Sequence, residues 1–322
     1  MPELDRPLLV VVDHVDGHLT TPSAEVLTLA RSLTTGGVSA VALEAPDTAA
    51  LGRYGAGAVY VPELDGLSPT VSAVAAEAVL AAVAQARPAA VLLVSSFAGK
   101  EIAARLAVAL DSGAVVDATG VTVENGALVA SKVVLQGTWE TTCEVTRGVP
   151  VIAVKPTVVE AAAADRAEPE VVAVPVEFSA AARAVRVLSR TEHPRGGRAP
   201  LGEARTVVVG GRGVEGDFSL VTELADELGA AVGATRVATD EGWIEHAAQV
   251  GQTGVTISPR LYIGIGVSGA IHHTAGMQAA QTIVAVNSDP EAPIFEMADL
   301  GIVGDLHDVL PQAIEELRRL KG

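Results

Sequence analysis

The sequence predicts an α/β protein of two domains. Valine-rich apolar runs alternate with alanine-rich stretches of helical length in both halves of the chain, which is typical of βαβ units on a parallel sheet. Of the 322 residues 49% are apolar and only 3% aromatic, so small side chains must fill the cores. A polar segment rich in Gly and Pro predicts a linker at 189–205 between an N-terminal domain (1–188) and a C-terminal domain (206–322).

The first elements follow the order of a βαβ unit. An uninterrupted apolar run predicts a buried strand at 8–12, and a helix with Ser23 as its N-cap follows to about residue 35. The next apolar run predicts a strand at 38–43. Ser68-Pro69 places a capping residue before a proline, the favoured order at a helix start, and predicts that the following helix begins there.

A second strand and helix and then a hairpin come next. The apolar run at 89–94 predicts a strand that ends in Ser95-Ser96, and the stretch 99–110 predicts a helix after it. The pattern changes to alternation over 121–130, around Asn125-Gly126. Because this pair favours the left-handed conformations of a two-residue turn, it predicts a hairpin that adds an antiparallel element to the sheet.

The same alternation of strands and helices continues to the C-terminal domain. Apolar runs at 151–154 and 171–176 predict two more strands, separated by the alanine-rich segment 160–166. In the C-terminal domain we predict strands at 206–209, 261–265 and 282–286 and helices at 217–228 and 270–281. Both domains therefore belong to the same fold class.

Charge excludes two classes of partner. The formal net charge is −17, and basic residues never occur in runs longer than two. Such a surface repels the phosphate backbone of nucleic acids and the headgroups of anionic lipids. We therefore expect neither nucleic acid nor membrane insertion.

Cysteine usage predicts the compartment. The single cysteine, Cys143, excludes an internal disulfide and a cysteine-based metal site in one chain. The N-terminus also lacks the basic and apolar regions of a secretion signal, so we expect a cytoplasmic protein. The uncharged stretch 261–288 is long enough to span a bilayer, but its two histidines and four glycines favour a buried site instead.

Two glycine motifs of the form G-x-G-x-x-G lie at 211–216 and 264–269, each after a predicted strand. Amides at such strand-to-helix turns can hold a pyrophosphate. Asp289 follows the second motif at about the distance at which an acidic residue binds a ribose. Alone, these features predict an NAD-dependent oxidoreductase, although glycine also occurs wherever a tight turn requires it.

Longer segments of the C-terminal domain carry a more specific signal. They are Gly251-Gln252-Thr253-Gly254, the run LYIGIGVSGAIHHTAGM at 261–277, NSDPEAPIF at 287–295 and ADLGIVGDL at 298–306. In this order and spacing they resemble the electron transfer flavoprotein alpha-subunit family. The resemblance covers about 206–311, whereas the first half shares with the family only its general layout and the segment 95–100.

The resemblance implies a fold, a cofactor and partners. The fold would be an N-terminal nucleotide-hydrolase-like α/β domain followed by a flavodoxin/Rossmann-like FAD-binding domain with a parallel sheet. The chain would form a heterodimer with a beta subunit that carries AMP. It would accept electrons from flavin dehydrogenases such as the acyl-CoA dehydrogenases of fatty acid beta-oxidation and pass them to a quinone oxidoreductase. As an electron carrier without substrate chemistry, it would need no catalytic residue.

The resemblance also implies which residues bind the cofactor. Arg212 would contact the FAD phosphates or adenosine, and Thr235 and Arg236 would lie beside the isoalloxazine. The flavin would be lined by Val250, Gly251, Gln252 and Thr253, the last with its hydroxyl near N5. The ribityl and pyrophosphate portion would be wrapped by Ser268, Gly269, Ala270, Ile271, His272 and His273, the last near the pyrimidine carbonyl. The adenosine end would be held by Asn287, Asp305 and Leu306.

These residue types suit a flavin that is reduced one electron at a time. A fixed cation such as Arg236 and a donor such as His273 stabilise an anionic semiquinone more than the neutral oxidised ring, which raises the first reduction potential. The sequence departs from the common family pattern at His272, where glutamine usually precedes the histidine. His272 is either a second titrating group near the cofactor or a packing residue.

Two alternative functions remain at this stage. Taken singly, Arg236 is explained as a surface arginine, Thr253 as a turn residue and Asp305 as a helix N-cap. An NAD-dependent oxidoreductase is one alternative, and a nucleotide-binding module without electron transfer is the other. The combination of Arg236, Thr253 and His273 argues against the second, because such a module has no use for polar groups at the ring. The sequence shows no Ser-His-Asp arrangement and no metal-ligand spacing.

Overall fold

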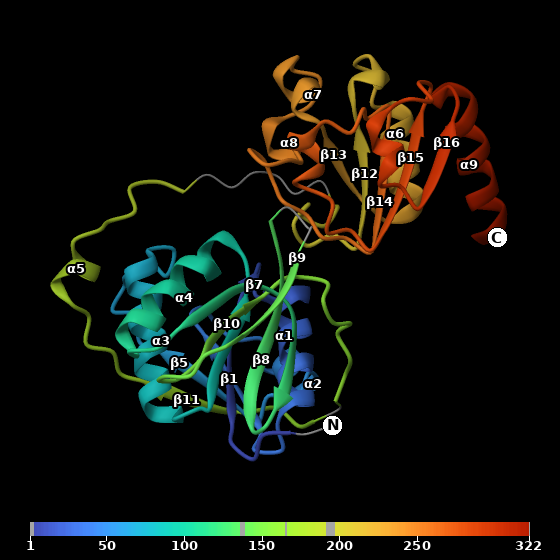
Figure 1. Cartoon of the computed structure of the whole chain (residues 1–322). Helices are drawn as coiled ribbons and strands as arrows, with labels where there is room; N and C mark the ends of the chain where they lie inside the picture. The colour runs from blue at the N-terminus through green and yellow to red at the C-terminus, as the bar shows by residue number, and fades with distance from the viewer. Residues whose placement is uncertain (1–2, 136–138, 165, 191–196, 322) are drawn as a thin grey trace. The chain divides into compact units, whose positions relative to one another are not determined.

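Two sheets carry the fold, one in each half of the chain (Figure 1). The computed structural model describes residues 3–135, 139–164, 166–190 and 197–321. The chain divides into two units close to residue 192. The predicted α/β class is confirmed, whereas the linker at 189–205 stays a prediction because 191–196 lie outside the described residues.

The sheet of the first unit is mostly parallel. Its described strands lie in the order β11 (Glu170–Val174), β5 (Ala58–Pro62), β4 (Val38–Ala42), β1 (Leu8–Val12), β6 (Ala90–Val94), β10 (Val151–Val154), β7 (Ala114–Glu124), β8 (Ala127–Val134) and β9 (Trp139–Glu144). The pairs from β11 to β7 are parallel, and β7, β8 and β9 are antiparallel. A small hairpin of β2 (His14–Val15) and β3 (His18–Leu19) follows β1.

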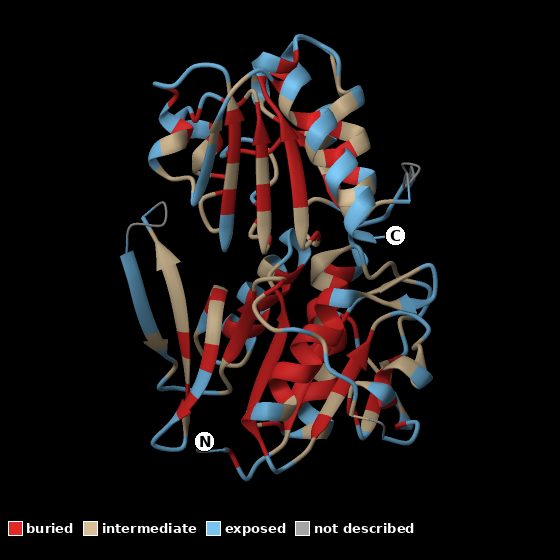
Figure 2. Ribbon diagram, turned by 90° about the vertical axis from the view of Figure 1, so that its right-hand side faces the viewer, coloured by how far each residue is buried: buried red, intermediate tan, exposed pale blue. Residues whose placement is uncertain are grey.

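Helices cover both faces of this sheet. They are α1 (Thr21–Leu33), α2 (Thr48–Arg53), α3 (Ser72–Ala86), α4 (Phe97–Ala109) and the short α5 (Ala180–Arg183). Alternate residues of β1 enter different cores, since Val10 packs in the same cluster as Leu27 of α1, and Val11 in the same cluster as Val79 of α3. Figure 2 shows the buried central strands between these helices. This two-sided burial explains why the parallel strands are continuous apolar runs.

The hairpin prediction is confirmed, but the starts of several helices differ from the sequence prediction. Asn125 and Gly126 have φ values of 51° and 81°, as the tight turn requires. Helix α1 starts at Thr21, because Thr20 rather than Ser23 is the N-cap. Helix α4 starts at Phe97, two residues early, because the Ser96 side chain accepts the Gly99 amide at 3.0 Å.

The prediction that a helix begins at Ser68-Pro69 is wrong. Helix α3 begins at Ser72, with Val71 as an N-cap that makes no side-chain hydrogen bond. The Ser68 hydroxyl lies 2.8 Å from that of Thr70, so it stabilises a local turn instead.

The second unit is a parallel α/β sheet. Its described strands lie in the order β13 (Ala231–Ala234), β12 (Thr206–Gly210), β14 (Leu261–Ile265), β15 (Thr282–Asn287) and β16 (Leu300–Val303). Its helical segments are η1 (Arg212–Val214), α6 (Ser219–Leu228), α7 (Arg236–Asp240), η2 (His246–Ala248), α8 (Ile271–Thr274), η3 (Pro293–Glu296) and α9 (Leu306–Lys321). The flavodoxin-like parallel sheet is thus present.

The two faces of this sheet are covered differently. On one face α6 and α9 bury Leu224, Leu310 and Ile314 against Val208. The other face is covered by irregular segments that contribute Ile257 and Met277. Loops rather than long helices therefore cover this second face.

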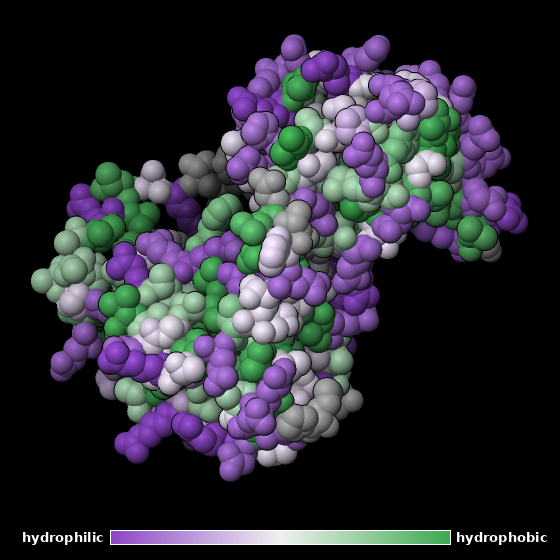
Figure 3. All heavy atoms as spheres, viewed as in Figure 1, coloured by the Kyte–Doolittle hydropathy of each residue, from purple (hydrophilic) through white to green (hydrophobic). Residues whose placement is uncertain are grey.

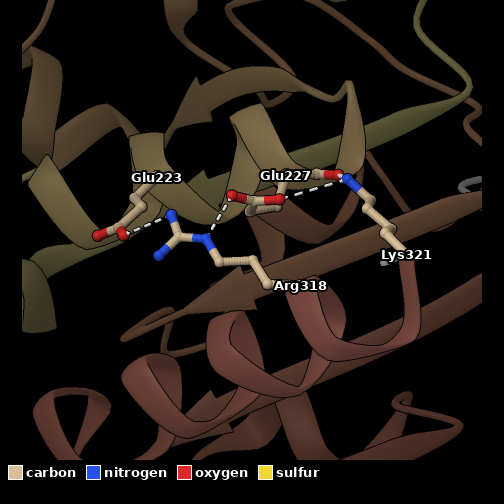
Figure 4. Close-up of polar contacts among 4 residues, drawn as sticks. All are labelled: Glu223, Glu227, Arg318 and Lys321. Carbon is tan, nitrogen blue, oxygen red and sulfur yellow. Dashed lines mark hydrogen bonds and ion pairs between the residues drawn. The ribbon is translucent and has the colours of Figure 1, made fainter.

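Ion pairs join α6 to α9 at the surface (Figure 4). Arg318 lies 2.9 Å from Glu223 and 2.6 Å from Glu227, and Lys321 lies 3.3 Å from Glu227. Because Arg318 and Lys321 are more than half exposed, each pair contributes little, and the buried apolar face of α9 dominates the packing. Polar and charged side chains are spread over the face drawn in Figure 3, with apolar groups between them.

Among the described residues, every helix is too short or too polar to cross a bilayer.

The predicted helix at 270–281 is much shorter than expected. Helix α8 ends at Thr274, and the chain continues in turns. A Cβ at Gly276 would lie 2.4 Å from the Gly251 Cα, so the two backbones touch there. This close approach of two loops overrides the helical propensity of the residues after Thr274.

The two glycine motifs pack against each other. A Cβ at Gly211 would lie 2.3 Å from the Gly266 carbonyl oxygen, and a Cβ at Gly213 would lie 2.8 Å from the Gly266 Cα. The Gly211 amide donates to Ile265 at 2.8 Å, and the Gly213 amide donates to Gly266 at 3.0 Å. Glycine is required here because backbone meets backbone, which leaves no room for a side chain.

We predict that Gly213→Ala destabilises the second unit by about 1–3 kcal/mol, the usual cost of overpacking. The added methyl would collide with the Gly266 backbone, which cannot move aside as a flexible side chain can. Gly202→Ala is the matched control, because its Cβ would meet only Val255 at 3.8 Å. Denaturant unfolding measures both variants, and equal stabilities for the two would contradict the packing argument.

Candidate functional site

A cavity of about 290 Å³ opens at the carboxyl ends of β12, β13 and β14. This edge is where ligands bind in open parallel α/β sheets. The cavity is lined by Arg212, Thr235, Arg236, Val237, Gln249, Val250, Gly251, Thr253, Val267, Ser268, Ala270, His272 and His273. The apolar wall comes from valines, and the polar groups come from the loops that follow the strands.

Most residues singled out from the sequence line this cavity, but some do not. Those outside its lining are Gln252, Gly269, Ile271, Asn287, Asp305 and Leu306. Asn287 donates to the Val267 carbonyl at 2.8 Å and so supports the cavity wall from behind. Asp305 accepts the His307 amide at 2.8 Å at the start of α9, as the N-cap explanation expects. Val237, Gln249 and Val267 also line the cavity, and no sequence motif marked them.

Two arginines bring positive charge to the cavity. Arg236 begins α7 and lies 3.1 Å from Asp240, one turn further along. Arg212 lies in η1 and is exposed, and within the described part of the chain its guanidinium has no hydrogen-bond or ion-pair partner. Because both arginines line one cavity of a chain of net charge −17, they offer positive charge to an anionic ligand there.

A chain of hydrogen bonds runs from a buried threonine into the cavity wall. The Thr239 hydroxyl lies 3.0 Å from Gln249 Oε1, and Gln249 Nε2 lies 3.0 Å from the Thr253 hydroxyl. Thr239 and Gln249 are buried, whereas Thr253 is exposed in the cavity. The only sequence signal for Gln249 is its place directly before the expected lining segment 250–253.

His273 is held by two groups of the protein itself. Its Nδ1 lies 3.0 Å from the Val250 carbonyl, and its Nε2 lies 2.8 Å from the Tyr262 hydroxyl. A carbonyl can only accept, so Nδ1 carries the proton, and Nε2 accepts from Tyr262 in the neutral ring. Burial lowers the pKa of His273 to about 4, and burial also raises the pKa of Tyr262.

The hydrogen bond expected from His273 to a pyrimidine carbonyl stays a prediction. His273 does line the cavity, but both ring nitrogens are already engaged. Donation to a ligand would require His273 to release Tyr262 or Val250. Its role in this arrangement is to connect the loop at Val250 to α8.

His272 lies at the open side of the cavity. Its Nδ1 is 2.9 Å from Gln252 Oε1, and the Gln252 amide donates to the His272 carbonyl at 2.8 Å. These two contacts join α8 to the loop 249–254 a second time. Because the His272 ring is exposed, it is not a core packing residue.

Family comparisons match both units. Residues 200–278 match the electron transfer flavoprotein FAD-binding domain, and residues 8–179 match the electron transfer flavoprotein domain. The electron transfer flavoprotein subunit alpha of Mycobacterium leprae (strain TN) is 45% identical over 98% of this chain and 99% of its own length. The subunit of the same name from Mycobacterium tuberculosis (strain ATCC 25618 / H37Rv) is 45% identical over the same shares of the two chains.

More distant similarities were also found. The electron transfer flavoprotein subunit alpha of Bacillus subtilis (strain 168) is 31% identical over 98% of this chain and 99% of its own length. The crystal structure of the glycosyltransferase SnogD from Streptomyces nogalater covers 98% of this chain and 94% of its own at 13% identity and a TM-score of 0.27. That score is too low to inform on the fold.

We predict that the stability of the second unit falls between pH 6.5 and pH 4 through His273. In the unfolded state His273 takes up a proton with the ordinary pKa of 6.5. In the folded state burial lowers this pKa to about 4. The unfolded state therefore binds more protons in this window, and stability rises with pH by up to about 3 kcal/mol.

Denaturant unfolding at several pH values tests this prediction. His273→Gln should flatten the pH dependence across the window, although it also lowers the stability at neutral pH. His272→Gln is the control because its ring is exposed, and it should leave the dependence as in the parent. An identical slope in His273→Gln and the parent protein would contradict the prediction.

Proposed function

The chain belongs to the electron transfer flavoprotein alpha-subunit family, and on that premise we propose that it carries electrons on an FAD held in the cavity of its second unit. Its second unit contains the FAD-binding domain of this family. The observation that carries the proposal is that two exposed arginines, Arg212 and Arg236, line the same cavity of a strongly acidic chain.

The residues of the cavity fit such a cofactor. Val237, Val250 and Val267 supply an apolar wall for a flat ring system, and the two arginines supply charge for its phosphates and for the reduced ring. Asn287 and Asp305 do not line the cavity. We propose that they contact the adenosine end of the cofactor outside it.

The chain's own residues adjust the charge around the ring. Bound FAD can take up two electrons and release them singly. Arg236 would stabilise negative charge that reaches the ring, and its exposed ion pair with Asp240 would moderate that effect. Arg212 would neutralise phosphate charge, so the cofactor can bind to a chain that otherwise repels anions.

Membership of this family also suggests the partners of the chain. We propose a heterodimer with a beta subunit that carries AMP, acting in the cytoplasm. Flavin dehydrogenases such as acyl-CoA dehydrogenases would donate electrons, and a quinone oxidoreductase would accept them after an anionic one-electron-reduced state. In this role the chain is an electron carrier and not an enzyme with its own substrate.

NAD-dependent chemistry, the alternative drawn from the glycine motifs, is not favoured by the geometry. Gly211 and Gly213 are packed against Gly266, so these glycines are explained by contact between two turns rather than by approach to a pyrophosphate. Family membership favours FAD as well.

We predict that Arg236→Ala lowers the first one-electron potential of the bound flavin while FAD stays bound. Removing a cation beside the ring disfavours the anion, on the order of tens of millivolts, since a one-electron couple moves about 59 mV per tenfold change in equilibrium constant. Asp240→Asn should shift the potential the other way, because it frees the Arg236 charge.

Redox titration of the heterodimer measures these shifts. Arg236→Lys keeps the charge and should lower the potential less. Arg198→Ala is the control for loss of one positive charge, because Arg198 pairs with Asp226 and does not line the cavity. An unchanged potential in Arg236→Ala with FAD retained would mean that Arg236 does not face the ring.

We also predict that the chain produced alone binds little FAD and that co-production with its beta subunit restores binding. The cavity is bordered by exposed residues, including Ile271, which is 71% exposed, so a partner surface is needed to close it. The visible absorbance per protein measures the FAD content. A stable, fully loaded chain without any partner would oppose the heterodimer.

A further inference from the structure

Two neighbouring histidines of α8 differ in their surroundings. His273 is only 6% exposed, and both of its ring nitrogens have protein partners. Burial lowers its pKa to about 4, so it brings no charge to the cavity at neutral pH. His272 is exposed and lines the same cavity. Of the two rings, that of His272 is therefore the one that can take up a proton without burying a charge.

The His272 ring has one nitrogen that contacts the protein and one that does not. Its Nδ1 lies 2.9 Å from Gln252 Oε1, and within the described part of the chain its Nε2 has no hydrogen-bond partner. A neutral imidazole carries one proton, on either nitrogen, whereas the protonated ring carries one on each. Protonation therefore places a charged donor at Nε2, whichever way the Gln252 amide is oriented.

The backbone of His272 is held in place by the loop 249–254. Its carbonyl accepts the Gln252 amide at 2.8 Å. A Cβ at Gly251 would lie 2.9 Å from the same carbonyl oxygen, so the loop approaches α8 closely here. Main chain and side chain of Gln252 thus both contact His272. These contacts keep the ring at the cavity wall and lower the cost of ordering it when a ligand binds.

A proton on His272 would find no negative charge in the cavity lining. The other charged or titratable lining residues are Arg212, Arg236 and His273. Among the described residues that line the cavity there is no carboxylate, and the loop 249–254 packed against His272 has no charged side chain. Asp240 lies outside the lining and pairs with Arg236 at 3.1 Å. The charge of a protonated His272 is therefore left for a ligand to neutralise.

A proton on His272 would balance the charge that reduction adds to the cavity. We propose that His272 takes up a proton when the cofactor ring gains an electron, an inference that rests on the proposed function. The electron comes from the protein that reduces the cofactor and the proton comes from water, so the net charge of the site does not change. Negative charge on the ring favours the protonated histidine, and by linkage the protonated histidine favours reduction to the same extent. Lower pH should therefore raise the first reduction potential.

The test compares three side chains at position 272 in the FAD-loaded heterodimer. His272→Gln cannot be charged, and His272→Lys keeps a positive charge throughout. Redox titrations from about pH 5 to pH 8, where histidines usually titrate, give the first one-electron potential of each. The parent should follow His272→Gln at high pH and approach His272→Lys at low pH. Its slope should exceed that of His272→Gln by at most a tenfold change in equilibrium constant per pH unit, about 59 mV, since one proton accompanies one electron.

The outcomes separate this inference from the proposed function. A parent heterodimer without flavin absorbance would refute the proposed function itself. With FAD bound, parallel curves of potential against pH for the parent and His272→Gln would overturn the role of His272 alone. If His272→Gln does not bind FAD, His272→Lys decides, because a slope equal to that of the parent would overturn the role as well.

His246→Gln is the matched control. His246 is also an exposed histidine of the second unit, but it does not line the cavity. This variant should keep the pH dependence of the parent. Loss of the slope in His246→Gln, with the slope kept in His272→Gln, would assign the proton to His246 and overturn the inference.

Discussion

The contact between the two glycine turns is the constraint on which the second unit depends. Gly211 and Gly213 meet the backbone of Gly266, so the loops after β12 and β14 leave the sheet side by side. Arg212 on one loop and Ser268 on the other can therefore line one cavity. A side chain at any of the three glycines would separate the loops, because backbone on both sides leaves no space for it.

Polar groups around the cavity differ in how firmly they are held. His273 and Gln249 are buried, and each is fixed by two side-chain contacts. Arg212 and Arg236 are exposed, and Arg236 has a carboxylate as an alternative partner. The interior supplies rigid hydrogen bonding, whereas the open side supplies charge that can adapt to a ligand. Rigid buried groups together with adaptable exposed arginines suit a cofactor whose charge changes.

Sequence patterns predicted strands such as β1, β6 and β10 because their two-sided burial demands continuous apolar runs, whereas the less buried β5, β13 and β16 were missed. They failed where tertiary contact decided the result, as at Gly276, whose approach to Gly251 ends a helix that propensity would continue. The site follows the same rule. Most lining residues were found through the resemblance to a known family, but Val237, Gln249 and Val267 were missed; the contacts of Gln249 with Thr239 and Thr253, for example, produce no periodic pattern.

Strand β9 leaves one edge of the nine-stranded sheet open. Among the described residues it pairs only with β8, and its own side chains are mostly exposed, including Trp139 at 65%. An unpaired strand edge is a template on which another extended chain can add, and this is how sheets begin to aggregate. Glu140 and Glu144 place two carboxylates on this edge, so a second copy approaching strand to strand would meet like charges. These two carboxylates would therefore oppose the pairing of two copies through this strand.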